Sequence, residues 1–188
     1  MMCPHVVVLA CGALLLTSCG KAESEHPWST GLEATASVQS VSDQARRDVC
    51  RSLDEHLTDS LDFYKLTRLM CSPGGILRAS STLVCEQLVA QCMAVNAPQP
   101  LLFGARIDQQ KCMNNLVHCN SPVSALESCI NRNVAHVLAL IDELTCDRVG
   151  DRALMERAAR TLGLNNAVMK CEDLSPACQN VIEDAVVR

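Results

Sequence analysis

Apolar residues recur at helical spacing along most of this chain after residue 42. The segment 43–71 contains neither Gly nor Pro, and its apolar side chains fall on one face at steps of three, four or seven residues. The run 72–75 (Ser-Pro-Gly-Gly) follows directly, and these residue types disfavour the continuation of a helix. The pattern therefore predicts one long helix that ends at Cys71.

Pro, Asn and Gly residues divide the rest of the chain into further helical segments. No segment alternates between apolar and polar residues with a period of two, so no strand is predicted. Ser124 with Glu127 three residues later is a capping-box pattern, and Ser175 before Pro176 indicates an N-cap and a first helical residue. The predicted fold class is all-α, a bundle of about five to seven helices. The segments after the first are a helix ending at Val95 and capped by Ser80 or Ser81, helices over 107–118, 124–145 and 151–162, a short stretch over 165–171, and a last helix from Pro176 towards Val187.

The first twenty residues carry a different pattern. Residues 6–16 (VVVLACGALLL) form an almost unbroken apolar run of eleven residues. A bilayer core of about 30 Å takes about 20 apolar residues, so this run is too short to span a membrane, but it fits the hydrophobic region of a secretory signal. The run ends at Leu16-Thr17-Ser18-Cys19. A leucine, two small residues and a cysteine at this place resemble the lipobox of bacterial lipoproteins.

The resemblance implies that a dedicated peptidase cuts before Cys19, after a diacylglycerol has been attached to its thiol. Residues 1–18 are then a signal peptide, and Cys19 is the lipid-bearing N-terminus of a protein of the bacterial cell envelope. Gly20, rather than Asp, after the cysteine implies the outer membrane. The alternative is an ordinary signal cut after Gly20, which gives a secreted protein. Either cleavage places the mature chain outside the cytoplasm.

Residues 19–42 show no periodic apolar pattern. They are rich in Ser, Ala, Thr, Glu and Gly, a composition typical of disordered linkers. The sequence therefore predicts a flexible, lipid-anchored tether over 19–42 and a cysteine-rich helical domain over 43–188. Trp28 in the tether has two interpretations, which are insertion into the membrane interface and docking on its own domain.

Ten cysteines remain in the mature chain besides Cys19. An even number of cysteines in an exported chain indicates a disulfide framework of up to five bridges, because an oxidising compartment does not keep thiols reduced. The predicted domain is thus a disulfide-stapled bundle. The ten disulfide candidates are Cys50, Cys71, Cys85, Cys92, Cys112, Cys119, Cys129, Cys146, Cys171 and Cys178.

Two pairing arrangements fit the spacings of these cysteines. In the first, two antiparallel helices use the seven-residue step shared by Cys85 and Cys92 and by Cys112 and Cys119. Because each step is about 10.5 Å along a helix, the cysteines of one step are too far apart to pair with each other. The predicted rungs are Cys85–Cys119 and Cys92–Cys112.

The second arrangement is a degenerate tandem repeat. The motif Cys-Glu-x-Leu-x-x-x-Cys-x-x-Val occurs at 85–95 and again at 171–181. Each copy is preceded by a widely spaced pair of cysteines, so each half of the domain would close its own four cysteines. Cys112 and Cys119 would then pair locally.

Charge and composition exclude several classes of partner. The chain has 16 Lys and Arg against 21 Asp and Glu, a net charge of −5. Such a mildly acidic chain with mixed charges has no electrostatic footprint for nucleic acid and no polybasic stripe for anionic lipids. The predicted partner is the membrane, through the N-terminal lipid, and a protein partner of unknown kind remains open.

The sequence contains no known catalytic motif: no G-x-S-x-G, no H-E-x-x-H, no phosphate-binding loop and no glycine-rich dinucleotide turn. We therefore predict no enzyme, no catalytic residue and no cofactor. The predicted function is that of a lipid-anchored envelope protein with a binding or structural role. The alternative is a thiol-based metal-binding protein, because soft sulfur and imidazole ligands suit copper(I). Its candidate ligands are Cys112, Met113, His118 and Cys119.

Overall fold

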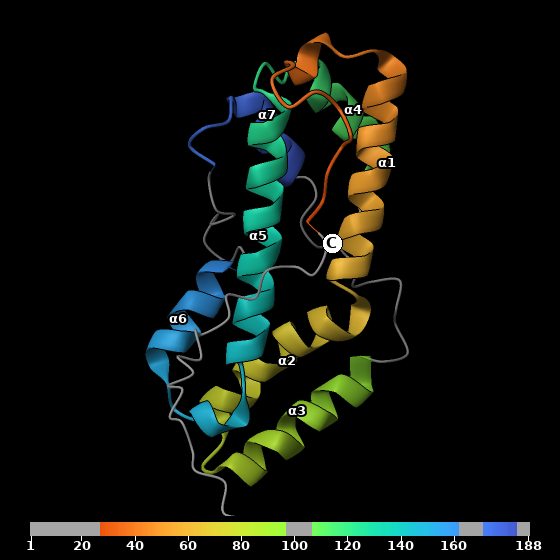
Figure 1. The fold of residues 1–188 in the computed structure, drawn as a ribbon. Helices are drawn as coiled ribbons and strands as arrows, with labels where there is room; N and C mark the ends of the chain where they lie inside the picture. The colour runs from red at the N-terminus through yellow and green to blue at the C-terminus, as the bar shows by residue number, and fades with distance from the viewer. Residues whose placement is uncertain (1–26, 97–106, 162–170, 184–188) are drawn as a thin grey trace, which may run out of the picture.

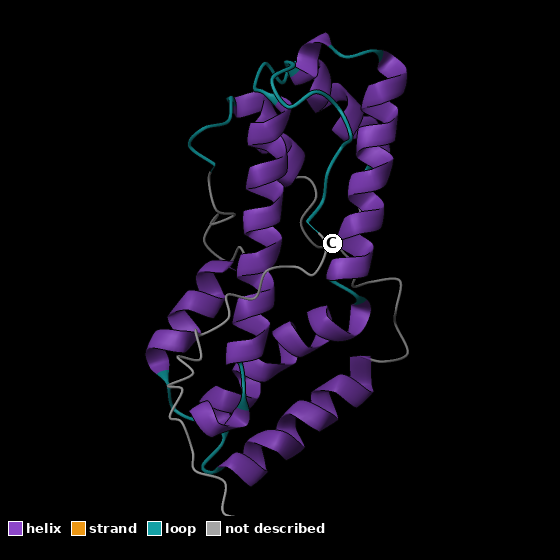
Figure 2. Cartoon of the chain, in the orientation of Figure 1, coloured by secondary structure: helices purple, strands orange, loops and turns teal. Residues whose placement is uncertain are grey.

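The computed structural model describes residues 27–96, 107–161 and 171–183. Within these ranges the secondary structure is helical apart from one isolated β-bridge between Ser37 and Pro122, which confirms the predicted all-α class (Figure 2). Seven α-helices and two short 3-10 helices are present in the described ranges. They are η1 (Val38–Ser40), α1 (Asp43–Ser60), α2 (Phe63–Arg78), α3 (Thr82–Asn96), α4 (Gln109–Val117), α5 (Val123–Glu143), η2 (Cys146–Arg148), α6 (Arg152–Thr161) and α7 (Pro176–Glu183).

The helices are arranged along an elongated molecule (Figure 1). The two longest helices, α1 and α5, run along its length, with α4 and α7 at one end and α2 and α3 at the other. α4 packs on both α1 and α7, whereas α2 packs on α3, α5 and α6. In the described residues, no helix is both long enough and apolar enough to cross a membrane.

The long helix predicted over 43–71 is in fact two helices. The chain turns at Leu61 and Asp62, where the Asp62 carboxylate accepts a hydrogen bond of 2.8 Å from the backbone N–H of Lys65 and so caps α2. The prediction that helix ends at 72–75 is also wrong, because α2 continues through Pro73 to Arg78. Packing of α2 against α3 outweighs the local cost of a proline and two glycines inside the helix.

The helix boundaries further along the chain are mostly confirmed. α3 ends one residue beyond the predicted Val95, and α7 begins at Pro176 as predicted. The capping box at Ser124 is wrong, since α5 begins at Val123 and the backbone N–H of Ser124 donates to the carbonyl of Ala34 instead. Most of the short stretch predicted over 165–171 lies outside the described residues.

One apolar core runs through the described domain. It consists mainly of Leu, Val, Ile and Cys side chains, together with Trp28 from the N-terminal segment. The largest fully buried side chains include Leu53, Leu116, Leu126 and Leu154, which come from α1, α4, α5 and α6. The core therefore joins helices that are far apart in the sequence.

The predicted tether over 19–42 is wrong for its C-terminal part. Residues 27–41, which we call the N-terminal strap, lie on the domain between α1 and α5 (Figure 1). Trp28 is only 5% exposed. Its backbone N–H donates to the Asn131 side chain at 2.7 Å, and its indole N–H donates to the Ser52 hydroxyl at 3.2 Å. Of the two interpretations of Trp28, docking on its own domain is confirmed.

Side chains of α5 hold the next part of the N-terminal strap. The carboxylate of Glu127 accepts hydrogen bonds from the backbone N–H of Thr30 at 2.5 Å and from its hydroxyl at 2.8 Å. The backbone of the strap then pairs with residues 121–124 at the start of α5. Residues 1–26, which hold the predicted signal peptide and Cys19, lie outside the described residues.

Two adjacent glycines of α2 offer a matched test of how closely α2 and α3 pack. A Cβ atom on Gly75 would lie 2.6 Å from Cγ2 of Val89, whereas one on Gly74 would meet no atom within 4 Å. We expect Gly75→Ala to destabilise the domain by about 1–3 kcal/mol, because α3 must move away. We expect Gly74→Ala to stabilise it by about 0.5–1 kcal/mol through the higher helix propensity of Ala. Urea unfolding of the two variants checks this, and equal effects of the same sign would contradict the close packing.

Candidate functional site

The ten cysteines of the domain form five disulfides, as their even number predicted. The Cα–Cα distances of the pairs lie between 4.6 and 6.0 Å, within the range that a disulfide spans. The pairs are Cys50–Cys112, Cys71–Cys92, Cys85–Cys146, Cys119–Cys178 and Cys129–Cys171.

Both predicted pairing arrangements are wrong. Neither the Cys85–Cys119 rung nor the Cys92–Cys112 rung forms, because α3 packs mainly on α2, whereas α4 packs mainly on α1 and α7. The tandem repeat places two bridges within the correct halves, Cys71–Cys92 and Cys129–Cys171. Its separate halves do not exist, however, since Cys85 of the first half pairs with Cys146 of the second.

The alternative metal site is not assembled in this structure. Cys112 is bonded to Cys50 and Cys119 to Cys178, so neither sulfur is a thiolate ligand. His118 is exposed at the end of α4, while Met113 packs against the core. Within the described ranges, no three His, Cys, Asp or Glu side chains lie close enough together to hold a metal ion.

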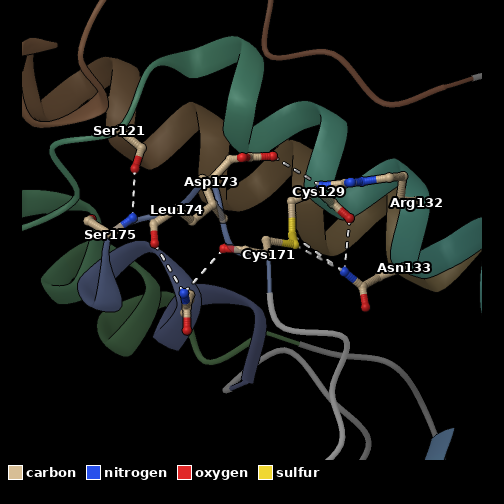
Figure 3. The surroundings of a disulfide bond; sticks show 9 residues. Ser121, Cys129, Arg132, Asn133, Cys171, Asp173, Leu174 and Ser175 are labelled. Carbon is tan, nitrogen blue, oxygen red and sulfur yellow. Dashed lines mark hydrogen bonds and ion pairs between the residues drawn. A yellow bond between two sulfur atoms is a disulfide. The ribbon is translucent and has the colours of Figure 1, made fainter.

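The Cys129–Cys171 bridge illustrates the structural role of these disulfides (Figure 3). It fastens the segment before α7 to α5, and Asn133 donates to the Cys129 carbonyl at 2.9 Å beside it. The backbone N–H of Ser175 donates to the Ser121 hydroxyl at 2.9 Å. The polar groups drawn around this bridge are bonded to one another, so the region serves to hold the chain together.

An open groove of about 660 Å³ lies between α2, α3 and the turn 144–147, away from the Cys129–Cys171 bridge. From α2 it is lined by Tyr64, Arg68 and Ser72, and from α3 by Thr82, Glu86, Val89, Ala90 and Met93. Leu144, Thr145, Cys146 and Asp147 close one side. This groove is the candidate functional site.

Two disulfides fix the walls of the groove. Cys71–Cys92 joins α2 to α3, and Cys85–Cys146 joins α3 to η2. Cys71 lies opposite Cys92, and Gly75 lies opposite Cys85 and Val89, so α2 and α3 are antiparallel. Because both walls are covalently joined, the groove is preorganised rather than formed when a ligand arrives.

The two ends of the groove carry opposite charges. Arg68 lies at one end with Tyr64 and Met93, and Glu86 and Asp147 lie at the other, where Cys85 is bonded to Cys146. Arg68 precedes Cys71 by three residues in α2, and Glu86 precedes Cys92 by six residues in α3. Because the two helices are antiparallel, Arg68 and Glu86 lie on opposite sides of the Cys71–Cys92 bridge. At 1.5 Å per residue, the charged ends are about 13 Å apart along the helix pair.

Arg68 has no partner within the described part of the chain. Its half-buried side chain lines the groove but forms no ion pair or hydrogen bond with another described residue. Glu86 is exposed and is likewise unpaired among the described residues. Since a half-buried guanidinium offers five donors that favour carboxylate, its lack of a partner marks this end as suited to an anionic group.

Two side chains whose pKa values are lowered do not line the groove. Burial lowers the pKa of His56 in α1, and the charge of nearby Asp59 offsets this only in part. The pKa of Asp151 is lowered by a hydrogen bond from the backbone N–H of Leu154 and next by one from Arg148. Asp151 thereby caps the start of α6. These shifts belong to local folding and not to the groove.

Sequence reasoning missed the groove, although the composition of α3 is unusual for a surface helix. α3 has a single charged residue, Glu86, among 15 residues, yet only Cys85 in it is buried. Leu83 and Val95 are 64% and 67% exposed, but neither lines the groove. A helix so poor in charge usually lies in a core, so the sequence marks α3 as unusual without locating the groove. No protein family, curated protein or solved structure gives a match to the chain.

Proposed function

We propose that this chain is an exported, lipid-anchored binding protein of the bacterial cell envelope, most simply at the outer membrane. The pairing of all ten domain cysteines supports export, because disulfides persist in oxidising compartments. The sequence Leu16-Thr17-Ser18-Cys19 supports a lipid on Cys19. The disulfide-fixed groove with its unpaired Arg68 is the single observation that favours a binding role.

The docked strap changes what the anchor can do. Because Trp28 is held by α1 and α5, only the residues from Cys19 to Pro27 connect the proposed lipid to the domain. These nine residues span at most about 32 Å when fully extended. The domain therefore stays close to the bilayer, whereas the tether predicted from composition would have let it move further away.

Replacement of the lipidated cysteine tests the anchor. We expect Cys19→Ser to prevent lipid attachment and cleavage, because the serine hydroxyl cannot take the place of the thiol. The precursor should then accumulate, and the detergent-phase partitioning of the mature protein should be lost. Intact-mass analysis and detergent phase separation of the envelope fraction measure both effects.

Cys3→Ser is the matched control, since Cys3 belongs to the same predicted signal but lies outside the lipobox. This variant should still be processed and lipidated. An unmodified mature N-terminus at Cys19, or cleavage after Gly20, would favour the secreted alternative instead.

A further inference from the structure

We propose that the groove between α2, α3 and the turn 144–147 binds an extended polypeptide segment in which an apolar side chain lies between a basic and an acidic one. This inference rests on the binding role proposed above and names the class of ligand. The charges, the length and the open shape of the groove all fit such a segment.

The Arg68 end of the groove is complementary in charge to an anionic group. A half-buried guanidinium has lost part of its hydration, and in this structure no described carboxylate or carbonyl replaces it. Tyr64, which is 65% exposed, and Met93 line the same end of the groove. A carboxylate bound there would gain charge-assisted hydrogen bonds from Arg68, and the apolar neighbours would strengthen them by excluding water.

The opposite end is complementary to a cation. Glu86 and Asp147 both line it, and Asp147 forms no ion pair with a described residue, although its charge interacts with that of neighbouring Arg148, which is itself paired with Asp151. The two acidic side chains come from α3 and η2, which the Cys85–Cys146 bridge holds together. A lysine or arginine of the ligand would therefore meet two carboxylates at a fixed place.

The length of the groove sets the spacing of the two ligand charges. The charged ends are about 13 Å apart, and an extended chain advances about 3.3 Å per residue, so the charges belong about four residues apart. Side chains at positions i, i+2 and i+4 of an extended chain point to the same side. The middle one then faces Val89, Ala90 and Leu144 in the centre of the groove.

The shape of the groove favours a polypeptide. The groove is open to solvent and not an enclosed cavity, so a chain can enter at one end and leave at the other. The hydroxyl oxygens of Thr82 and Thr145 line it, and each can accept a hydrogen bond from a peptide N–H, although the Thr145 hydroxyl already donates to Asp147. An acyl chain would gain nothing from these hydroxyls or from the two acidic side chains.

A designed peptide serves as the probe. It is Ser-Lys-Ser-Val-Ser-Glu-Ser-amide with a fluorescent label on its N-terminal amino group, and its binding to the full mature protein in detergent is measured by fluorescence anisotropy. Two further peptides carry Lys at both charged positions or Glu at both. We expect the Lys/Glu peptide to bind at least tenfold more tightly than either, because only it matches both ends of the groove.

Variants of Arg68 test the assignment of the two ends. Arg68→Gln should weaken binding of the Lys/Glu peptide about tenfold. Arg68→Glu should invert the preference, so that the Lys/Lys peptide binds most tightly, a result that misfolding cannot produce. Arg78→Glu is the control, because Arg78 is an exposed residue of α2 that does not line the groove. It should leave the affinities and their order unchanged.

Several results would overturn the inference. They are equal binding of the three peptides, an unchanged preference in Arg68→Glu, and absence of binding at millimolar peptide. Displacement of the peptide by a short-chain phospholipid added to the same detergent solution would assign the groove to lipid and also overturn it. The mass of the N-terminus and the number of free thiols are measured on the same sample. A lipidated, fully oxidised protein that binds no peptide would contradict only this inference, whereas an unlipidated or thiol-rich protein would contradict the proposed function.

Discussion

Full reduction of the five disulfides is expected to lower the melting temperature of the domain by about 20 °C or more. Loss of one native disulfide costs about 2–5 kcal/mol in small secreted domains. Three of the bridges here close loops of 59 to 62 residues, and long loops lose the most entropy when closed. Five such losses approach or exceed the whole stability of a typical domain, about 5–15 kcal/mol. Circular dichroism melts with and without a dithiol reductant measure the shift.

The control for reduction is removal of one bridge alone. Cys119→Ala combined with Cys178→Ala removes a bridge whose two cysteines are fully buried. This double variant should lose about 2–5 kcal/mol, measured by urea unfolding, and keep its helical spectrum. A melting temperature that does not respond to the reductant, or free thiols in the protein before reduction, would contradict the disulfide framework.

Trp28→Ala is expected to destabilise the domain by about 3–5 kcal/mol, the usual cost of removing a large buried aromatic side chain. The substitution empties the place of the indole between α1 and α5 and removes its hydrogen bond to Ser52. It should also release the N-terminal strap, which limited proteolysis near residue 30 would detect as faster cleavage.

Trp28→Phe is the matched variant. It retains an aromatic ring and both backbone hydrogen bonds to Asn131 but lacks the indole donor. We expect it to cost about 1 kcal/mol, the typical net value of one hydrogen bond, together with a smaller packing loss. Equal stability of Trp28→Ala and the parent protein would show that residues 27–41 form a tether after all.

Two sequence features predicted the correct part of the fold: the helical spacing of apolar residues and the even number of cysteines. Helical spacing of apolar residues is a local property, so α3, α4, α5 and α6 were predicted within a few residues. The even count of cysteines predicted that all ten would be paired, because that inference needs only the compartment and not the geometry. The break at Asp62 was missed because no Gly or Pro marks it.

Features that depend on distant partners were not predictable from local patterns. The strap resembles a linker in composition, and its partners Glu127 and Asn131 lie about a hundred residues further along the chain. The disulfide map depends on which helices are neighbours, and spacing alone does not specify that. The groove likewise requires three separate segments, from α2, α3 and the turn 144–147, to meet.

The overlap of the disulfides has a consequence for resistance to proteases. Every peptide bond between residues 50 and 178 is enclosed by at least one of the bridges Cys50–Cys112, Cys85–Cys146 and Cys119–Cys178. A protease that cuts the backbone once anywhere in this interval leaves two fragments that are still covalently joined. Neither piece can diffuse away, so a nicked molecule keeps both fragments and remains able to close again around the same core.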